Sequence, residues 1–336
     1  MLGTPLVSIL VPIYNVEDYI ERCARSVFEQ TYQDLEYVFV DDGTPDASID
    51  ILKKVIEDYP NRKDRIRIIR HEQNKGLAAA RNTAIASCHG DYVLHVDSDD
   101  WLEYDAVELL AQCQQETDAD IVYTNGYYCH KQESYKVNCR AWFTDKEMLL
   151  KSFLQDKATI SIWSKLIKKS LYTDNNIKCD ERGCYYEDFQ VLSRLIYYSQ
   201  KIVCLDAFIY HYDRSNPSSI VMNIPHSIDI QRQGLLSIQV VRDFFQDKEQ
   251  HYFDLVNLFY LKYLHRMLNT NCRYKNRKGY GEFLNLLSQS ERRDWQLIGW
   301  DKPWNRMIDS NYYIKLFLLP FWQTKQKAVS LFKRFL

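Results

Sequence analysis

The stretch "YVLHVDSDDWL", residues 92–102, is the most informative part of the sequence. An apolar run of strand length is followed at once by Asp97, Asp99 and Asp100. Carboxylates held close together repel one another, and charges near a core are costly to bury. The turn is therefore either a solvated cap for the next helix or a site that holds a positive charge.

Short apolar strands that end in polar turns alternate with amphipathic segments over the first 125 residues. The expected strands are residues 6–14, 35–43, 66–70, 92–96 and 119–124. Segments with helical spacing of their apolar residues fill the intervals, and Asn15 is expected to cap the first of these helices. Alternation of this kind predicts an α/β fold, in which helices cover both faces of a mostly parallel sheet.

The pattern becomes less regular after residue 125. We expect a helix at 145–155, another that begins near Glu187, and two strand-like segments, "KIVCL" and "AFIYHY". Long amphipathic helices with few glycines or prolines follow from residue 225. The sequence therefore predicts two domains, residues 1–222 and residues 223–336.

Composition excludes several classes of protein. The chain has 336 residues and a net charge of −2, which gives no electrostatic reason to expect nucleic acid as a partner. Its nine cysteines contain no Cys-x-x-Cys pair, so we expect reduced thiols in the cytoplasm rather than disulfides or a zinc site. The N-terminal "MLGTPLVSILVP" lacks the features of a secretory signal. No apolar run reaches the roughly 18–20 residues that a membrane span needs.

Polar residues follow three of the predicted strands and should converge, because doubly wound sheets bind ligands beyond the carboxyl ends of their strands. Tyr14 follows the first strand, Asp41–Asp42 the second and Asp97–Asp100 the fourth. Carboxylates without a His/Cys pattern favour Mg²⁺ or Mn²⁺, and Mg²⁺ is often shared with substrate phosphates. The alternative, a simple helix cap at Asp97–Asp100, is weakened by the acidic pair at the equivalent end of another strand.

Other candidates stay open when they are considered from the residues alone. Tyr14 could stack on a nucleobase or simply pack against its neighbours. Lys75 and Arg81 flank the start of a glycine-led helix, which could receive a phosphate or be an ordinary loop-to-helix entry. Taken alone, the pair Glu187–Asp188 is better explained as negative charge placed at the N-terminus of a helix.

Four ordered motifs resemble those of the family 2 glycosyltransferases of the GT-A fold. The motifs are "VSILVPIYN", "EYVFVDDGTPDAS", "NKGLAAARNTAI" and "GDYVLHVDSDDWL", within residues 5–125. The resemblance extends to about residue 220 through "SIWSKLIKKSLY", "YYEDFQVLSRLI" and "YHYDRSNPSSI", which are similar to acceptor-side elements of bacterial polysaccharide members. It implies a Rossmann-like GT-A sheet, followed here by a C-terminal helical region.

The resemblance implies a nucleotide-sugar site with a metal ion. Its expected donor-binding residues are Pro12, Tyr14, Asp41, Asp42, Lys75, Arg81, Asp97, Ser98 and Asp99. Tyr14 would stack on the base, expected to be uracil, and Asp42 would accept a hydrogen bond from it, while Arg81 would reach the base or phosphates. Asp99 of the Asp-x-Asp element would bind Mn²⁺ or Mg²⁺ directly, with Asp97 on the ribose or the metal's waters. His211 is a further candidate ligand, although a satisfied, partly buried histidine is an equal alternative.

The resemblance also implies the chemistry. Asp188, beside Glu187, would be the general base that takes the proton of the acceptor hydroxyl, and the nucleoside diphosphate would leave from the opposite face, with inversion. The candidates for contact with the acceptor are Asp100, Trp163 and Lys165. For Trp163, stacking on a sugar ring and ordinary core packing are equal alternatives.

The predicted function is transfer of a sugar from a UDP-sugar to a glycan or lipid-linked glycan in the synthesis of capsular polysaccharide, exopolysaccharide or lipopolysaccharide. A sugar-phosphate nucleotidyltransferase is the first alternative, but "PIYNVED" lacks the glycine-rich loop that such enzymes carry after the first strand. A non-catalytic nucleotide-sugar-binding module is the second. The C-terminal region is expected to mediate contact with acceptor, membrane or a second copy of the chain. Its apolar and then basic end, 312–336, could lie at the inner face of the cytoplasmic membrane, or pack on its own domain.

Overall fold

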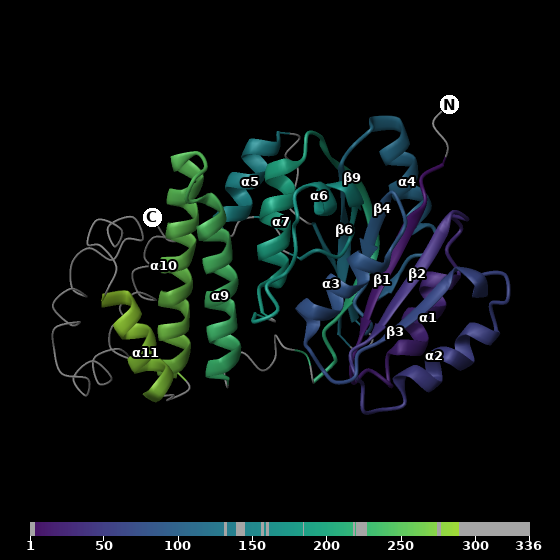
Figure 1. The fold of residues 1–336 in the computed structure, drawn as a ribbon, viewed down its shortest axis with the longest axis horizontal. Coiled ribbons are helices and arrows are strands. Elements are labelled where there is room, and N and C mark those ends of the chain that lie inside the picture. Colours follow the sequence, from purple (N-terminus) through teal and green to yellow (C-terminus); the bar gives the residue numbers. More distant parts are fainter. Residues whose placement is uncertain are drawn as a thin grey trace. The chain divides into compact units, whose positions relative to one another are not determined.

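The structure is a computed structural model, and it describes residues 4–288 except 131–132, 139–144, 156–157, 159–160, 184, 218, 220–226 and 274–276. In this part of the chain nine strands form one mixed sheet, of order β3-β2-β1-β4-β8-β6-β9-β5, with β7 paired to β6 (Figure 1). The predicted α/β fold is confirmed.

The first half of the sheet is parallel. Its strands are β1 (Val7–Ile13), β2 (Leu35–Asp41), β3 (Ile66–Arg70) and β4 (Tyr92–His95). Val7 lies opposite both Leu35 of β2 and Tyr92 of β4. Every residue of β1 and β2 is buried, which explains why these strands are continuous apolar runs rather than alternating ones.

The second half of the sheet brings in antiparallel strands. They are β5 (Trp101–Leu102), β6 (Ile121–His130), β7 (Glu133–Val137), β8 (Lys165–Lys168) and β9 (Ile202–Asp213). β8 runs antiparallel to both β4 and β6, whereas β9 runs parallel to β6 and antiparallel to β5. The two expected segments "KIVCL" and "AFIYHY" are one strand, β9, whose pairing with β6 shifts register around Asn125.

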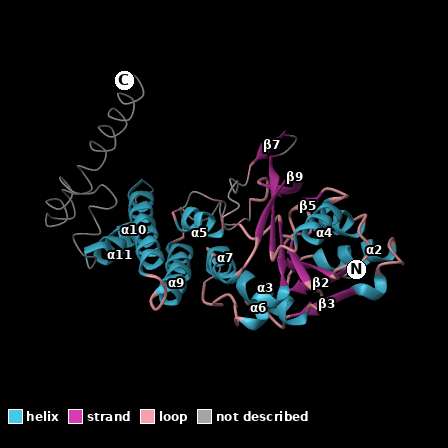
Figure 2. Cartoon of the chain, turned by 90° about the horizontal axis from the view of Figure 1, so that it is seen from above, coloured by secondary structure: helices cyan, strands magenta, loops and turns pink. Residues whose placement is uncertain are grey.

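Helices cover both faces of the sheet. They are α1 (Ile20–Phe28), α2 (Ser48–Glu57), α3 (Leu77–Ser87), α4 (Ala106–Thr117), α5 (Lys146–Leu154), α6 (Lys169–Asp174) and α7 (Glu187–Tyr198), with a 3-10 turn at Lys63–Arg65. Figure 2 shows α2 and α4 on one side of the sheet and α3 and α6 on the other. The core between sheet and helices α1, α2 and α4 is continuous, and its members include Ile9, Phe28 and Leu110.

One local prediction was wrong. Asn15 does not cap the first helix, because α1 begins at Ile20 and Asn15 has a left-handed φ of 56°. The Asn15 N–H instead donates to Thr44 Oγ1 at 2.8 Å, so this segment turns across the end of β2 before the helix starts. Asparagine tolerates this backbone conformation better than most residues.

The described residues form two compact units. One combines the sheet and helices α1–α7 with α9 (Ile228–Phe245) and the start of α10 (Gln250–Arg273), up to Val256. The other contains the rest of α10, from Asn257, and α11 (Arg277–Ser288). The assignment of 1–222 as a separate catalytic domain stays a prediction.

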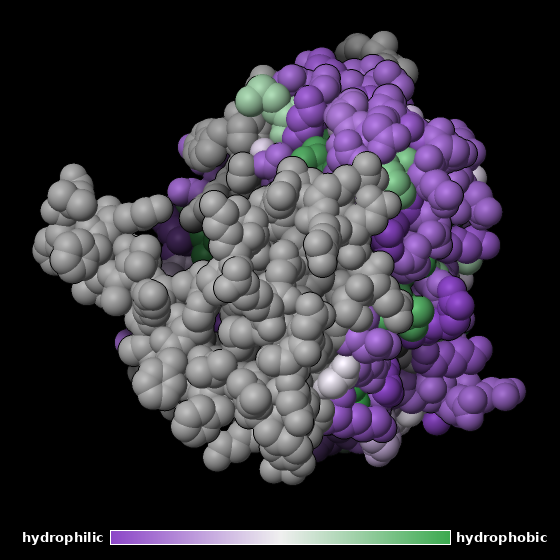
Figure 3. Space-filling model, turned by 90° about the vertical axis from the view of Figure 1, so that its left-hand side faces the viewer, coloured by the Kyte–Doolittle hydropathy of each residue, from purple (hydrophilic) through white to green (hydrophobic). Residues whose placement is uncertain are grey.

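Within these ranges no helix has both the length and the apolar character needed to cross a membrane. The surface that described residues present in Figure 3 is mainly hydrophilic, with a few small apolar spots, as is usual for a face in contact with water. The segment 312–336, predicted to reach a membrane interface, lies outside the described residues.

Candidate active site

The carboxyl ends of the central parallel strands bring the predicted polar turns to one edge of the sheet. The Asp42 N–H donates to the Ile13 carbonyl at 3.0 Å, and the Val96 N–H donates to the Leu10 carbonyl at 3.0 Å. These bonds extend the strand ladder into the turns, so Tyr14, Asp42 and Asp97 follow strands that end together. The edge matches the general position of ligand sites in doubly wound sheets.

Tyr14 stands at this edge with an exposed ring. Its relative exposure is 44%, which is unusual for a large aromatic residue that directly follows a buried strand. The left-handed turn at Asn15 directs the chain away immediately after it. An exposed aromatic face suits stacking on a planar base. Pro12, also predicted to touch the base, is buried within β1.

Asp42 organises the loop that leads into α3. One carboxylate oxygen lies 2.7 Å from His71 Nδ1 and accepts the Lys75 N–H at 2.9 Å, and the other accepts the Gly76 N–H at 2.7 Å. Gly76 needs its glycine because its φ is 92°. The side chain of Asp42 is almost fully buried, so its role toward a base stays a prediction, whereas its role in shaping the Lys75 loop is visible.

Asp41 likewise supports the backbone. Its Oδ1 accepts the Thr44 N–H at 2.9 Å, and its Oδ2 lies 3.4 Å from Arg70 Nε. Lys75 itself has an exposed side chain at the tip of the loop, where it can reach a phosphate. Asp41 and Asp42 therefore hold the backbone that surrounds the site. The side chains of Lys75 and Tyr14 are exposed there and are accessible to a ligand.

The Asp-x-Asp turn carries two carboxylates that crowd each other. Burial, followed by the negative charge of Asp97, raises the pKa of Asp99 to about 6. Asn216 Nδ2 donates to Asp99 Oδ2 at 2.9 Å, and Arg22 donates to the Asp99 carbonyl oxygen at 2.8 Å. Ser98, between the two acids, is buried. Two desolvated, mutually repelling carboxylates fit a hard divalent cation.

The predicted third metal ligand does not join them. His211 Nε2 lies 2.8 Å from Glu103 Oε1, Nδ1 lies 3.6 Å from Cys129 Sγ, and the ring is stacked between two aromatic neighbours. Among the described residues, no three His, Cys, Asp or Glu side chains are grouped so that they could hold a metal. His211 therefore pairs with other groups in this structure, and the assignment of Asp97, Asp99 and His211 as metal ligands stays a prediction.

Asp100 is a structural residue rather than an acceptor contact. Its side chain is fully buried, accepts the Tyr210 hydroxyl at 2.6 Å and accepts the Asp213 N–H at 2.7 Å. Burial first, and then the charges of Asp99 and Asp97, raise the pKa of Asp100 well above its usual range. Asp100 thus links the Asp-x-Asp turn to β9, and its contact with the acceptor stays a prediction that its burial does not favour.

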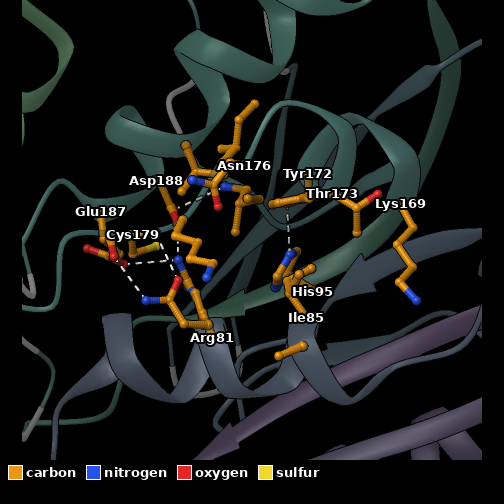
Figure 4. Close-up of a pocket in the computed structure, with 16 residues that line it drawn as sticks. Arg81, Ile85, His95, Lys169, Tyr172, Thr173, Asn176, Cys179, Glu187 and Asp188 are labelled. Carbon is orange, nitrogen blue, oxygen red and sulfur yellow. Dashed lines mark hydrogen bonds and ion pairs between the residues drawn. The ribbon is translucent and has the colours of Figure 1, made fainter. Parts of the chain in front are cut away.

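Arg81 lies at the centre of a cluster of three carboxylates, and its predicted contact with the base or phosphates stays a prediction. It is buried on α3, where it donates to Asp97 at 2.9 Å. It also donates to Glu187 at 3.0 Å and to Asp188, as Figure 4 shows. The guanidinium fork suits several carboxylates at once. One cation cannot balance three carboxylates, of which Glu187 is buried and the other two are partly buried. Burial therefore raises the pKa values of both Glu187 and Asp188 despite the opposing effect of Arg81.

Trp163 and Lys165 are both buried, against the expectation that they touch the acceptor. Trp163 is stacked on Tyr210, with ring centroids 4.7 Å apart and planes 13° apart. Lys165 has no exposed surface, and its ammonium group points at backbone carbonyls of its own segment. The contacts of Trp163 favour the alternative of core packing, and its contact with a sugar stays a prediction.

A cavity of about 310 Å³ adjoins Asp188 on the side of α3 and α6 (Figure 4). Its wall includes Arg81, Ile85, His95, Tyr172 and Asp188. Burial lowers the pKa of His95 to about 3, so this histidine is neutral, and its Nε2 lies 3.1 Å from the Tyr172 hydroxyl. The volume lies at the lower end of the range for small-ligand sites.

The sequence did not indicate Arg22 and Asn216, which donate hydrogen bonds to the Asp-x-Asp turn from other parts of the chain. Arg22 of α1 lies 2.6 Å from Asp213 Oδ2, and its guanidinium carbon lies 3.7 Å from the centre of the Trp101 ring. No sequence signal marks Arg22, because a lone arginine on an amphipathic helix is ordinary. Asn216 lies in the Ser/Asn/Pro loop after β9, whose composition alone indicated a flexible turn.

Comparison with known families identifies the first half of the chain. Residues 8–173 match the family model "Glycosyl transferase family 2". The chain is 36% identical over 231 residues to the uncharacterized glycosyltransferase EpsJ of Bacillus subtilis, a match that covers 66% of this chain and 64% of EpsJ. It is 30% identical over 224 residues to glycosyltransferase GlyG of Streptococcus pneumoniae, covering 63% of this chain and 72% of GlyG. The chain thus spans slightly less than two thirds of EpsJ.

Solved structures share the fold. TarS 1–349 of S. aureus, in complex with UDP-GlcNAc, matches with a TM-score of 0.56 and 20% identity, covering 82% of this chain and 89% of that one. The mannosyltransferase PcManGT from Pyrobaculum calidifontis, in complex with GDP-Man and Mn²⁺, matches with a TM-score of 0.56 and 15% identity, covering 96% and 88%.

Proposed function

The chain belongs to glycosyl transferase family 2, and we propose that it transfers a sugar from a nucleoside diphosphate donor to a glycan hydroxyl with inversion. One observation supports this most strongly. Arg81 joins Asp97, at the donor side of the sheet edge, to Asp188, the only predicted base. Arg81 thereby holds together the Asp-x-Asp turn and the predicted base, although these two acids lie about 90 positions apart in the sequence.

The donor side is suited to a uridine nucleotide sugar. Tyr14 offers the exposed ring for the base, and the loop that Asp42 shapes places Lys75 where phosphates would approach. Asp97 and Asp99 would hold Mn²⁺ or Mg²⁺ together with the diphosphate, and the bound ion would neutralise the charge of the leaving group. The bound UDP-GlcNAc of TarS and the bound GDP-Man and Mn²⁺ of PcManGT support this arrangement.

Asp188 would carry the proton transfer. Its carboxylate removes the proton of the acceptor hydroxyl while that oxygen bonds to the anomeric carbon, and the bond from this carbon to the diphosphate oxygen breaks on the opposite face. The raised pKa of Asp188 makes it a stronger base than an exposed aspartate. Glu187 and Arg81 orient it, because Arg81 occupies one of its two oxygens.

We propose a growing surface glycan or lipid-linked glycan as the acceptor, and 1–222 as the catalytic domain. This acceptor class rests on the acceptor-side motifs around Trp163, Glu187 and His211, which resemble those of bacterial polysaccharide enzymes. The region 223–336 would contact acceptor, membrane or a second copy of the chain.

Release of nucleoside diphosphate from a panel of UDP-sugars, with Mn²⁺ and with or without oligosaccharide acceptors, tests the proposal. Asp188→Asn should abolish transfer while UDP binding survives, and Asp99→Asn should weaken both. Asp64→Asn is the matched control, since Asp64 is exposed on the 3-10 turn far from the sheet edge. Full transfer by Asp188→Asn, or equal losses in the control, would contradict the assignment.

A further inference from the structure

We propose that Lys165 is a positioning residue for the general base Asp188: it holds the short backbone segment whose amide hydrogen-bonds the base. The inference rests on the proposed function, because it gives Asp188 the role of base. This role replaces the expectation that Lys165 contacts the acceptor, because the Lys165 side chain is completely buried.

A continuous set of contacts links the two residues. Lys165 Nζ donates to the Ser161 carbonyl at 2.6 Å and to the Trp163 carbonyl at 3.2 Å. Ile162 lies between these two carbonyls, and its N–H donates to Asp188 Oδ2 at 3.0 Å. The ammonium group therefore holds the peptide group that carries the Ile162 amide, through the Ser161 carbonyl, and also the peptide group after Trp163. The Ile162 amide in turn holds the carboxylate.

The segment is anchored on its other side by the sheet. Ser164 has a left-handed φ of 56°, and its carbonyl accepts the Thr124 N–H at 3.1 Å and the Thr124 hydroxyl at 2.9 Å. A non-glycine residue in this conformation costs energy unless surrounding contacts impose it. The turn is thus held between Lys165 and β6, and a fixed turn can place an amide accurately.

A buried ammonium group needs a reason, because removing it from water is costly. Here the two carbonyls and the face of Tyr123, 4.4 Å from Nζ, offset that cost. An apolar side chain could fill the same space without any desolvation penalty. What the lysine adds is a fixed positive charge near Asp188, which lowers the pKa of that carboxyl against the effect of burial.

The two carboxylate oxygens of Asp188 accept hydrogen bonds from different partners. Arg81 of α3 donates to Oδ1, and the Ile162 amide donates to Oδ2. Asp97, from the turn after β4, and the adjacent Glu187 are the other charged groups that act in the site. With one donor on each oxygen, the remaining lone pairs point in few directions, which is what a base for one specific hydroxyl requires.

The test compares Lys165→Met with Lys168→Met in the full-length chain. Lys168 lies on the same strand, but it is half exposed and pairs with Asp120 at 3.1 Å, so it serves as the matched control. For Lys165→Met we expect kcat to fall about 100-fold, as for a base displaced by about an ångström. KM for the donor and the affinity for UDP should stay unchanged, and the acid limb of the kcat/KM profile should move to higher pH.

Lys165→Arg keeps the charge and should recover the position of the acid limb, with part of kcat. If Lys165→Met fails to fold, as a melting curve would show, Lys165→Gln replaces it, because the amide can still donate to the carbonyls without a charge. A folded Met or Gln variant with wild-type kcat and an unmoved acid limb would overturn the inference. So would a variant that raises only KM for the acceptor, since that is the behaviour of an acceptor contact. Normal transfer by Asp188→Asn would instead refute the proposed function itself, so the two failures are distinguishable.

Discussion

Replacement of Arg81 by methionine is the perturbation for which the structure makes the strongest energetic prediction. The side chain is 4% exposed and donates to three carboxylates. Removing one partner of a buried ion pair typically costs about 3–5 kcal/mol, because the remaining charges stay buried and unpaired. We expect a loss of that size at pH 8, and Arg81→Lys should lose less, since one ammonium group can replace the charge but not the fork.

The loss should depend on pH in a defined direction. Burial raises the native pKa values of Glu187 and Asp188 above those of the unfolded chain. A group with a raised native pKa contributes stability below its unfolded pKa, about 4 for these acids, and loses it as pH rises through the native pKa. Without Arg81 these native pKa values rise further, so the variant should recover stability relative to wild type as the pH is lowered from 8 toward 5.

Urea unfolding of both proteins at pH 5, 6.5 and 8 measures this difference. Arg25→Met is the control, because Arg25 also pairs with two acids, Glu21 and Asp58, but at the surface. Exposed ion pairs contribute little, so its loss should be small at every pH. An Arg81→Met loss as small as that of the control, or one that does not change with pH, would refute the reasoning about the buried cluster.

Three further predictions concern the rest of the site. Tyr14→Ala should weaken UDP binding by about 1–3 kcal/mol in calorimetry, the usual contribution of base stacking, while the melting temperature stays constant because the ring is exposed; unchanged affinity would remove Tyr14 from the site. Asp100→Ala should reduce the free energy of unfolding by about 1–3 kcal/mol because the Tyr210 O–H and the Asp213 N–H both lose their acceptor, whereas Asp100→Asn should retain most of the stability; equal losses would show that shape rather than hydrogen bonding matters. His211→Gln should leave the Mn²⁺ concentration dependence of UDP binding unaltered, because His211 pairs with Glu103; a shift in that dependence would restore it as a ligand.

Much of the fold could be read from local patterns. β1, β2 and β4 are short apolar runs that end in polar turns, and a parallel sheet buried on both faces requires that pattern. The antiparallel insertion of β8 between β4 and β6 could not be read in this way, because "KLIK" is too short and too polar at its ends to indicate a central strand. Its placement depends on contacts between segments more than 40 residues apart.

Residue types and their order in the chain were enough to indicate an acidic edge and a resemblance to a glycosyltransferase family, and only that resemblance implied a base at the start of a helix. Chemistry of this kind needs carboxylates and an aromatic ring at strand ends, so these signals are local. The partner of each carboxylate was decided only in three dimensions. Asp100 accepts from Tyr210, His211 pairs with Glu103, and Lys165 donates to the backbone of its own segment. Buried polar groups generally need a hydrogen-bond partner, and the packed fold determines which partner is within reach. Sequence spacing cannot specify such pairings, since the groups that meet lie on elements that only the folded sheet brings together.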